Sequence, residues 1–288
     1  MPYDPLNEEQ REIRDLVRTL ARERVAPRAA EIDKKGEFPL DMVELFKEHE
    51  LFGLPFDEQY GGTGTGALMV LVAIEELSKV CATTGLIMAV QELGSLGIKL
   101  AGTEEQKQRF LPNLASGEWL AAYALTEPGS GSDSAAMRTE AKLDGDAYVI
   151  NGGKRFITNA GVAHLYTVFA KTDPEAGHSG ISAFVVEADR PGFEVGRIEP
   201  KMGIKGSTTG ELFFNDVRIP AENLLGQEGE GFKIAMRILD RSRPGIAAQG
   251  LGLAQGATDY ALEYAKSFAI AATLVRSGAP SSTLLAAR

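Results

Sequence analysis

The sequence predicts a multi-domain protein of mixed α and β structure, in which a compact β domain lies between two helical regions. Apolar residues recur every three or four positions through residues 1–118, short strand-like runs begin at about Trp119, and helical spacing returns at Gly231. A chain of 288 residues is also longer than one typical core requires. We expect domains at 1–118, 119–228 and 229–266, followed by a tail of different composition at 267–288.

The first helices are marked by their ends as well as by their apolar spacing. Asn7 is a typical N-cap, and the glutamates that follow it suit the positive end of a helix dipole. A shorter helix is expected directly after Pro39. Glycines crowd residues 61–66, but their spacing is not that of a dinucleotide fingerprint and no strand precedes them, so we expect a flexible loop.

Residues 67–100 are rich in Ala, Leu, Val and Met, and they predict two packed helices of a bundle core. Within them, residues 91–100 either line a ligand cavity or serve core packing alone. Thr103 and Gln106 have the spacing of a capping box. Another helix is therefore expected to begin there and to end before Gly117.

Turn dipeptides interrupt the strand-like runs of the middle domain. We expect a hairpin in which the Asn-Gly-Gly turn at 151–153 joins a strand at 147–150 to a strand at 155–158. Asp144-Gly145 and Pro191-Gly192 predict two more turns. Further strands are expected at residues 165–170, 182–187 and 211–214.

The last predicted helix begins at Gly231, with Ile234, Ala235, Ile238 and Leu239 on one face. Pro244-Gly245 should kink or interrupt it, because proline lacks a backbone donor and crowds the preceding turn. The second half of the helix is expected at residues 246–266.

Composition excludes several classes of function. Forty acidic and thirty basic residues give a formal net charge of −10 without a basic block, which argues against a nucleic-acid or membrane-surface partner. No apolar run is long enough to predict a membrane span, and the start does not resemble a targeting segment. One cysteine, Cys81, cannot form a disulfide within the chain and is expected to be buried. We therefore expect a cytoplasmic protein. No metal-ligand spacing is found at His49, His164 or His178.

The most informative stretch runs from Tyr123 to Asp133 and reads YALTEPGSGSD. Pro128-Gly129 forces a turn, and Gly131 lets a ligand approach the backbone closely. Successive amides in such a turn can form an anion-binding concavity. Hydroxyls are offered by Thr126, Ser130 and Ser132. The stretch is thus either a loop that holds a phosphate or a flavin edge, or a polar surface turn.

This stretch resembles, position by position, the first signature of the acyl-CoA dehydrogenase family, and in particular its short-chain, butyryl-CoA-like members. The resemblance covers residues 1 to about 266. It implies an N-terminal helical bundle, a middle antiparallel β-barrel and a C-terminal helical domain that is incomplete in this chain. By the same resemblance, the missing helices would leave exposed the apolar face around Leu251, Leu253 and Leu262. Further segments that carry it are Phe156-Ile-Thr-Asn159, Lys201–Ser207, Phe214–Pro220, Asp240–Pro244 and Gly250–Gln255.

The resemblance implies FAD as cofactor and acyl-CoA as substrate. The implied FAD-binding residues are Tyr123, Leu125, Thr126, Gly131, Ser132, Phe156, Ile157 and Thr158. The implied acyl-CoA-binding residues are Ser132, Asp240 and Arg243. Phe156 stands where the family commonly has Trp, and it keeps the aromatic face without the N–H donor. Asp240 and Arg243 also have an alternative interpretation as an exposed helical ion pair.

The implied reaction is the α,β-dehydrogenation of acyl-CoA thioesters, with electrons passed to an electron-transfer flavoprotein by a protein that is usually a homotetramer. A carboxylate base removes the proton from the acyl Cα. Most members carry it near the end of the C-terminal domain, in a segment that we do not find here. A minority carry it just before the CoA-binding arginine, where this chain has Ser242. Glu127 belongs to the architecture of the loop, so we predict no catalytic residue in this chain.

The tail suggests why that segment is missing. Residues 267–288 contain no Asp or Glu and depart from the family pattern, so we expect that a frameshift or early stop replaced the end of the protein. Two alternatives to an active dehydrogenase follow. One is an inactive truncated remnant that binds FAD or acyl-CoA weakly. The other is a flavin monooxygenase or nitroalkane-type oxidase on the same fold, against which Asp240 and Arg243 argue.

Overall fold

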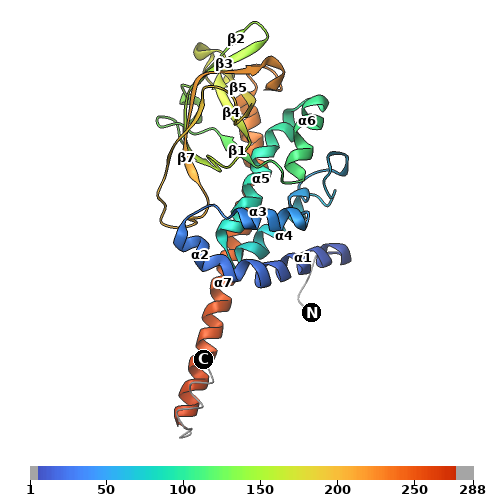
Figure 1. Cartoon of the computed structure of the whole chain (residues 1–288), viewed down its shortest axis with the longest axis vertical. Helices are drawn as coiled ribbons and strands as arrows, with labels where there is room; N and C mark the ends of the chain where they lie inside the picture. The colour runs from blue at the N-terminus through green and yellow to red at the C-terminus, as the bar shows by residue number, and fades with distance from the viewer. Residues whose placement is uncertain (1–5, 277–288) are drawn as a thin grey trace.

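The computed structural model describes residues 6–276. In Figure 1 the strands form the upper part of the molecule with α6 beside them, α1 to α4 form the lower part, and the last helix runs past both and projects beyond them. The helices are α1 (Glu8–Leu20), α2 (Ala26–Lys35), α3 (Leu40–Glu48), α4 (Ala67–Ser78), α5 (Ala82–Ala101), α6 (Glu104–Ala115) and α7 (Gly231–Arg276). The strands are β1 (Ala121–Ala124), β2 (Glu140–Asp144), β3 (Ala147–Thr158), β4 (Leu165–Lys171), β5 (Ile181–Glu187), β6 (Phe193–Ile198), β7 (Thr209–Pro220) and β8 (Leu224–Leu225).

The predicted helix ends are confirmed by reciprocal caps. Gln10 N donates to Asn7 Oδ1 at 2.9 Å, and Asn7 N donates to Gln10 Oε1 at 3.1 Å. Thr103 and Gln106 form the same capping box at the start of α6. Each box satisfies backbone donors that the first turn of a helix leaves unpaired.

The glycine-rich loop at residues 61–66 is confirmed, and one of its glycines is sterically required. A Cβ atom at Gly62 would lie 2.1 Å from the carbonyl oxygen of Phe56, so no larger residue fits there. The two helices predicted at 67–100 are also confirmed, as α4 and α5. The sole cysteine is buried among them.

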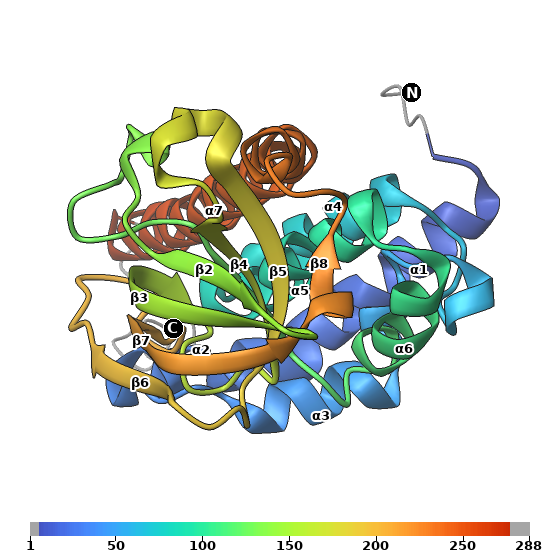
Figure 2. The ribbon, with the colours of Figure 1, turned by 90° about the horizontal axis from the view of Figure 1, so that it is seen from above.

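The middle domain is an open mixed sheet, which corrects the antiparallel β-barrel. Its order is β6-β7-β3-β2-β4-β5-β8, with β1 paired to β4, and within the described residues no pairing joins the two edge strands. β4 runs parallel to both β1 and β2. A parallel pair needs a long crossover, and the β2–β3 hairpin supplies it between β1 and β4. Figure 2 shows the curved sheet beside α5 and α7.

The predicted hairpin at 147–158 is wrong, because these residues form the single strand β3. The strand pairs with β7 along its length, and the ladder shifts register between Ile150 and Gly152. Gly152 has φ 143°, and a Cβ there would lie 2.6 Å from the Thr139 hydroxyl. Glycine thus permits a bulge and a close approach instead of a turn. The hairpin turn lies earlier, where Asp144 pairs with Ala147.

Of the kink or interruption predicted at Pro244-Gly245, the interruption is wrong, because α7 is continuous through both residues. An interior proline costs about 3 kcal/mol, and the packing of α7 against α4 and α5 offsets it. That packing is close. A Cβ at Gly252 would lie 2.4 Å from the Glu75 carbonyl oxygen, and one at Gly256 would lie 2.0 Å from that of Lys79.

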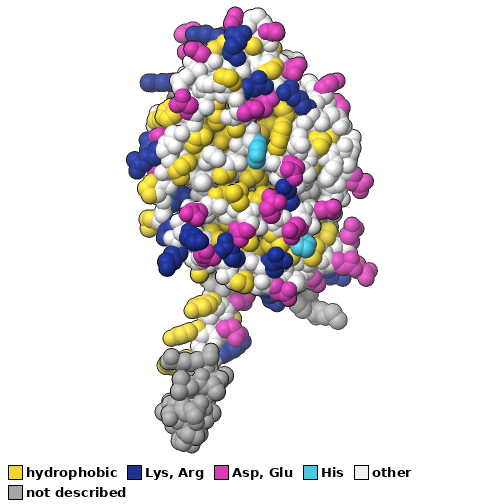
Figure 3. Space-filling model, viewed as in Figure 1, with side chains coloured by type: hydrophobic (Ala, Val, Ile, Leu, Met, Phe, Trp, Pro, Cys, Tyr) yellow, Lys and Arg dark blue, Asp and Glu magenta, His cyan; other side chains and the backbone are white. Residues whose placement is uncertain are grey.

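Beyond this contact α7 leaves the body of the molecule. The predicted apolar face is exposed there, at Leu251, Leu253 and Leu262. Figure 3 shows hydrophobic side chains along the projecting helix, and the exposed set also includes Tyr260, Tyr264 and Phe268. Within residues 6–276, no helix has the length and apolar character that crossing a membrane requires.

Candidate functional site

The start of β1 is fixed by a buried amide on α5. Gln91 Nε2 donates to the carbonyl oxygens of Leu114 and Trp119, at 2.8 Å each. Its Oε1 accepts from Ala121 N at 2.9 Å. One side chain thereby ties α5 to the end of α6 and to the first residue of the strand that leads into the predicted turn.

The turn after β1 is closed by its own backbone. Glu127 N donates to the Ser130 carbonyl at 2.9 Å, and Ser130 N donates back at 3.1 Å. The Ser130 hydroxyl donates to the Asp133 carbonyl at 2.9 Å. At Gly129 and Gly131 a Cβ would meet no atom within 4 Å. The turn is therefore rigid at its base and open on the side of its two glycines.

A buried ion pair holds the turn against the sheet. Lys154 Nζ donates to Glu127 Oε1 at 2.8 Å and to the Leu125 carbonyl at 3.1 Å. The Glu127 carboxylate also accepts from Arg138 N at 2.6 Å and from Thr139 N at 3.1 Å. Glu127 is 6% exposed and the Lys154 side chain is fully buried. The loop-architecture role expected for Glu127 agrees with these contacts.

Both members of this pair have shifted pKa values. Burial of the carboxyl opposes ionisation, but the charge of Lys154 and the donated hydrogen bonds outweigh it and hold the pKa of Glu127 below its ordinary value. Burial lowers the pKa of Lys154 to about 8, against the favourable charge of Glu127. An ion pair at this depth survives only because its remaining bonding positions are also satisfied.

Phe156 presents its ring to solvent next to the turn. The β3–β7 ladder shifts register between Lys154 and Ile157, and Phe156 takes the left-handed φ of 59° within that bulge. Arg155 N donates to the Thr126 carbonyl at 2.8 Å, which joins the bulge to the turn. The Phe156 side chain is 56% exposed. A left-handed aromatic residue is a strained conformation, of the kind that clusters at functional sites.

Four more predicted residues lie around this junction. The Tyr123 hydroxyl is buried without a hydrogen-bond partner in the described part of the chain, and burial raises its pKa. The Leu125 and Ile157 side chains are buried, so only their backbone can face a ligand. Thr158, half-buried, pairs with Thr209 across the β3–β7 ladder.

The predicted acyl-CoA residues lie apart from this bonded network. Asp240 and Arg243 form an ion pair of 3.7 Å on α7, with side chains 73% and 72% exposed. Among residues 6–276, no hydrogen bond or ion pair joins either of them to the turn. Ser132 is exposed. The Ser242 hydroxyl donates to the Leu239 carbonyl at 3.2 Å, so it is bound within its own helix.

The residues around the turn fit a flavin and its pyrophosphate. The glycines leave space for close approach, and Tyr123 holds a buried donor without a partner among the described residues. Phe156 offers an exposed ring, over which the Arg155 guanidinium lies 4.9 Å from the centroid. In the described chain, the side-chain hydroxyls of Thr126, Ser132 and Thr158 also make no hydrogen bond. The set therefore supplies hydrogen-bond donors beside an apolar surface, as cofactor sites usually do.

Lys154 and the cavity-lining residues of α5 were not identified as site residues from the sequence. Lysine in a strand normally indicates a solvent-facing position, and the bulges of β3 hide the alternation that places Lys154 inside. Some of residues 91–100 pack in the core and others line a cavity, which were the two roles left open for them. Gln91, Gly94 and Ser95 are buried, and a cavity of about 430 Å³ is lined by Glu92, Leu96, Lys99 and Leu100.

The histidines take part in local contacts. His164 Nδ1 accepts from Leu120 N at 3.1 Å, and the His178 ring packs edge-on against Phe232. In the described chain, no three His, Cys, Asp or Glu residues come together as a possible metal site.

The chain folds into three parts: a helical domain, a middle sheet and a long last helix. Together with the hydroxyl-lined turn at the sheet edge, these parts define a class of flavoprotein fold. The chain belongs to the acyl-CoA dehydrogenase family. The profile "Acyl-CoA dehydrogenase, N-terminal domain" matches residues 7–118, the middle-domain profile matches 122–217, and the C-terminal-domain profile matches 229–274.

Individual relatives agree with this assignment. The chain is 50% identical to the short-chain-specific acyl-CoA dehydrogenase of Clostridium acetobutylicum, over 91% of this chain and 69% of that one. A chain in the structure described as the electron transferring flavoprotein of Acidaminococcus fermentans is 40% identical, with a TM-score of 0.87 over 97% of this chain and 82% of that one. The acyl-CoA dehydrogenase of Bacillus anthracis complexed with FAD is 37% identical, with a TM-score of 0.79 over 87% and 43%.

Proposed function

We propose that this chain binds FAD at the turn after β1 and belongs to the machinery that dehydrogenates short acyl-CoA thioesters between Cα and Cβ. The observation that carries the proposal is the junction of the turn with β3. There the buried Glu127–Lys154 pair fixes a glycine-opened, hydroxyl-lined backbone beside the exposed ring of Phe156.

Bound FAD would supply the hydride acceptor of the reaction. The backbone at Tyr123, Leu125 and Ile157 and the side chains of Thr126, Phe156 and Thr158 would hold the flavin ring. Gly131 and Ser132 would leave room and a hydroxyl for the pyrophosphate. The Tyr123 hydroxyl, buried and without a hydrogen-bond partner among the described residues, supports a ligand near this strand. FAD in the B. anthracis relative supports the same cofactor.

Acyl-CoA would bind along α7. A guanidinium suits the phosphate, carbonyl and purine groups of CoA, and Arg243 is 72% exposed and paired, among residues 6–276, with Asp240. Ser132 would contribute from the turn. The similarity to a chain in the electron transferring flavoprotein structure supports such a flavoprotein as electron acceptor. The homotetramer implied by the family resemblance is part of this proposal.

The 288 residues are proposed to bind these ligands without supplying the base. Ser242 occupies the position where a minority of the family carry a glutamate, and its hydroxyl is bonded to the Leu239 carbonyl. A hydroxyl in that state cannot accept the proton of the acyl Cα, whereas a carboxylate at the same position can.

The test combines flavin absorbance with a restored base. We expect the purified chain, supplied with FAD, to hold flavin that does not bleach when butyryl-CoA is added without oxygen. Ser242→Glu should bleach, and the matched Ser242→Gln should not. Arg243→Gln should weaken butyryl-CoA binding and leave FAD bound. Failure to hold FAD would contradict the cofactor site, and bleaching of the unmodified chain would contradict the missing base.

A further inference from the structure

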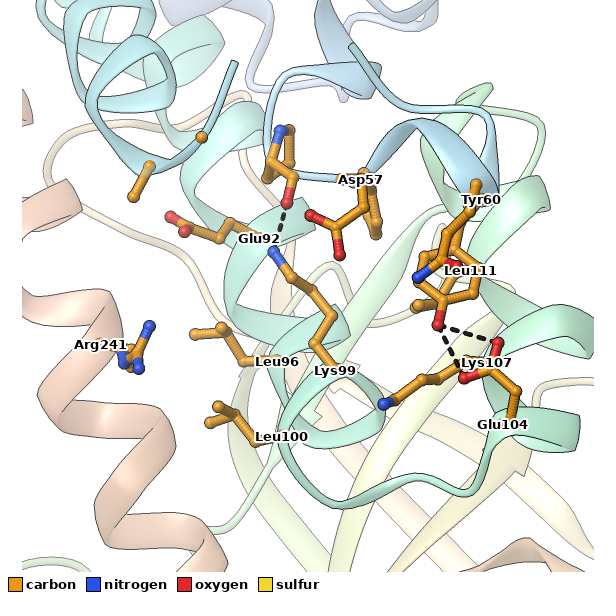
Figure 4. Close-up of a pocket in the computed structure, with 15 residues that line it drawn as sticks. Asp57, Tyr60, Glu92, Leu96, Lys99, Leu100, Glu104, Lys107, Leu111 and Arg241 are labelled. Atoms are coloured by element: carbon orange, nitrogen blue, oxygen red, sulfur yellow. Dashed lines mark hydrogen bonds between the residues drawn. The ribbon is translucent and has the colours of Figure 1, made fainter. Parts of the chain in front are cut away.

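The cavity beside α5 lies outside the proposed flavin and acyl-CoA site. Its walls come from the loop at residues 55–67, from α5 and α6, and from Arg241 on α7 (Figure 4). Arg241 is rotated by about 100° from Asp240 and about 200° from Arg243 around the helix. None of the residues proposed for FAD or acyl-CoA lines it. Its volume of about 430 Å³ lies within the range of small-molecule sites.

One acidic side chain in this cavity, Glu92, has no hydrogen-bond donor in the described part of the chain. Glu92 is 6% exposed, and in the described part of the chain its carboxylate makes no hydrogen bond or ion pair. Lys99 lies two helical turns further along α5, but its ammonium donates to the Pro55 carbonyl and lies 5.3 Å from the centroid of the Phe56 ring. A buried carboxyl without a donor is costly. Glu92 is therefore a ready acceptor for a group from outside the chain.

Two basic side chains in the same cavity are also free. Lys107 on α6 and Arg241 on α7 make no hydrogen bond or ion pair within residues 6–276. Glu104 is different, because it accepts from the Tyr60 hydroxyl at 3.0 Å. Figure 4 shows Glu92 and Lys107 on opposite sides of the cavity, with Lys99 between them and with Leu96 and Leu100 on the side toward Arg241. The cavity thus offers a carboxylate and an ammonium without hydrogen-bond partners in residues 6–276, together with the apolar side chains of Leu96 and Leu100.

We propose that this cavity binds a small zwitterion, with an ammonium group at Glu92, a carboxylate at Lys107 and an aliphatic segment on Leu96 and Leu100. Such a ligand satisfies the buried carboxylate of Glu92 and the half-buried ammonium of Lys107 at once, which neither a simple fatty acid nor a simple amine does. Arg241 adds positive potential at the exposed edge. The site is independent of the proposed flavin site, because the two share no residue.

The experiment uses the full chain and three probes of similar length, 6-aminohexanoate, hexanoate and hexylamine, each titrated by calorimetry at neutral pH. We expect 6-aminohexanoate to bind about tenfold more tightly than either singly charged probe. Glu92→Gln should weaken 6-aminohexanoate and hexylamine but not hexanoate. Lys107→Met should weaken 6-aminohexanoate and hexanoate but not hexylamine. Glu194→Gln, on the exposed edge strand β6, is the matched control and should change nothing.

Two results would overturn the proposal. Equal or undetectable binding of all three probes would remove the zwitterion preference. Unchanged 6-aminohexanoate affinity in Glu92→Gln would remove the role of the buried carboxyl. If Glu92 instead serves as a structural partner of Arg241, Glu92→Gln lowers the melting temperature and no probe binds. Flavin absorbance, recorded on the same samples, reports separately on the proposed FAD site.

Discussion

Two glutamates of this protein are buried to the same extent, 6% exposed each, and their surroundings are opposite. Glu127 receives three donors, from Lys154 Nζ and two backbone amides. Glu92 receives none from the described residues, and the only charge that favours its ionised form is that of Lys99, which is bonded elsewhere. Burial raises the pKa of Glu92, whereas the donors around Glu127 lower its pKa despite burial. The burial of a carboxyl therefore does not by itself tell whether its role is structural or ligand-binding.

This difference separates a structural carboxylate from a binding one. Every acceptor position that Glu127 uses is directed at the chain itself, so the residue fixes the turn and has little left for a ligand. Glu92 keeps its acceptor capacity and faces a cavity. The same comparison explains why Glu127, in the most informative stretch of the sequence, is a poor candidate for a catalytic base.

The largest effect is expected for Lys154→Met. It removes the cation and leaves the Glu127 carboxylate buried with an uncompensated charge, which should lower the free energy of unfolding by about 3–5 kcal/mol. Urea denaturation followed by circular dichroism measures it. Adding Glu127→Gln to the same chain should restore part of the loss, since the stranded charge is then gone. A loss below about 1 kcal/mol in the single variant would show that the pair does not hold the turn.

Glu127→Gln alone should cost about 1–3 kcal/mol near neutral pH, because charge-assisted bonds are replaced by weaker ones and Lys154 stays buried. The lowered pKa of Glu127 also sets the direction in which its contribution to stability changes with pH. A carboxyl whose folded pKa is lowered stabilises the protein above its ordinary value of 4.5, and this contribution is lost as the pH falls further. The acid limb of a melting-temperature profile should therefore be shallower in Glu127→Gln. An unchanged limb would argue against the shifted carboxyl.

Glu92→Gln should have the opposite sign and a smaller size. A carboxyl whose folded pKa is raised destabilises the protein once the pH exceeds 4.5, because the folded state must then lose its proton or bear a buried charge. Removing it should raise the free energy of unfolding by about 1 kcal/mol at neutral pH, and should change little below pH 4.5. Melting-temperature profiles against pH, measured for both Glu92→Gln and Glu127→Gln, check this prediction. A stability change of the same sign in the two variants would contradict the comparison between the two glutamates.

Much of the fold followed from local sequence signals. The capping boxes at Asn7 and Thr103 need only residues three apart, so they could be predicted without knowing the rest of the chain. The failures arose where distant contacts decided. Gly152 was predicted as part of a turn, but Thr139 and the β7 ladder hold it in a strand. Pro244 was predicted to kink or interrupt α7, but the helix continues through it where it packs against α4 and α5.

The candidate site divides in the same way. The turn at 126–132 could be predicted from its glycines and hydroxyls, and its junction with Phe156 follows from the Arg155–Thr126 hydrogen bond. The inward position of Lys154 could not be predicted from the sequence, because a bulge changes which strand positions face inward. The Glu92 cavity could not either, because it is assembled from three helices and a loop that are distant in sequence.

A third carboxylate, Asp240, extends the comparison to a carboxylate that is exposed instead of buried. It is paired, like Glu127, but 73% exposed and 3.7 Å from Arg243. Water screens such a pair, and holding two mobile side chains together offsets much of the gain, so Asp240→Asn should change the free energy of unfolding by less than about 0.5 kcal/mol. Urea denaturation on the same scale as Lys154→Met measures it. If the exposed pair proved as important as the buried one, depth could not be the reason that Glu127 matters, and the turn would have to be held by its backbone bonds alone. A small stability effect together with weaker butyryl-CoA binding would instead place Asp240 among the ligand-binding residues of α7.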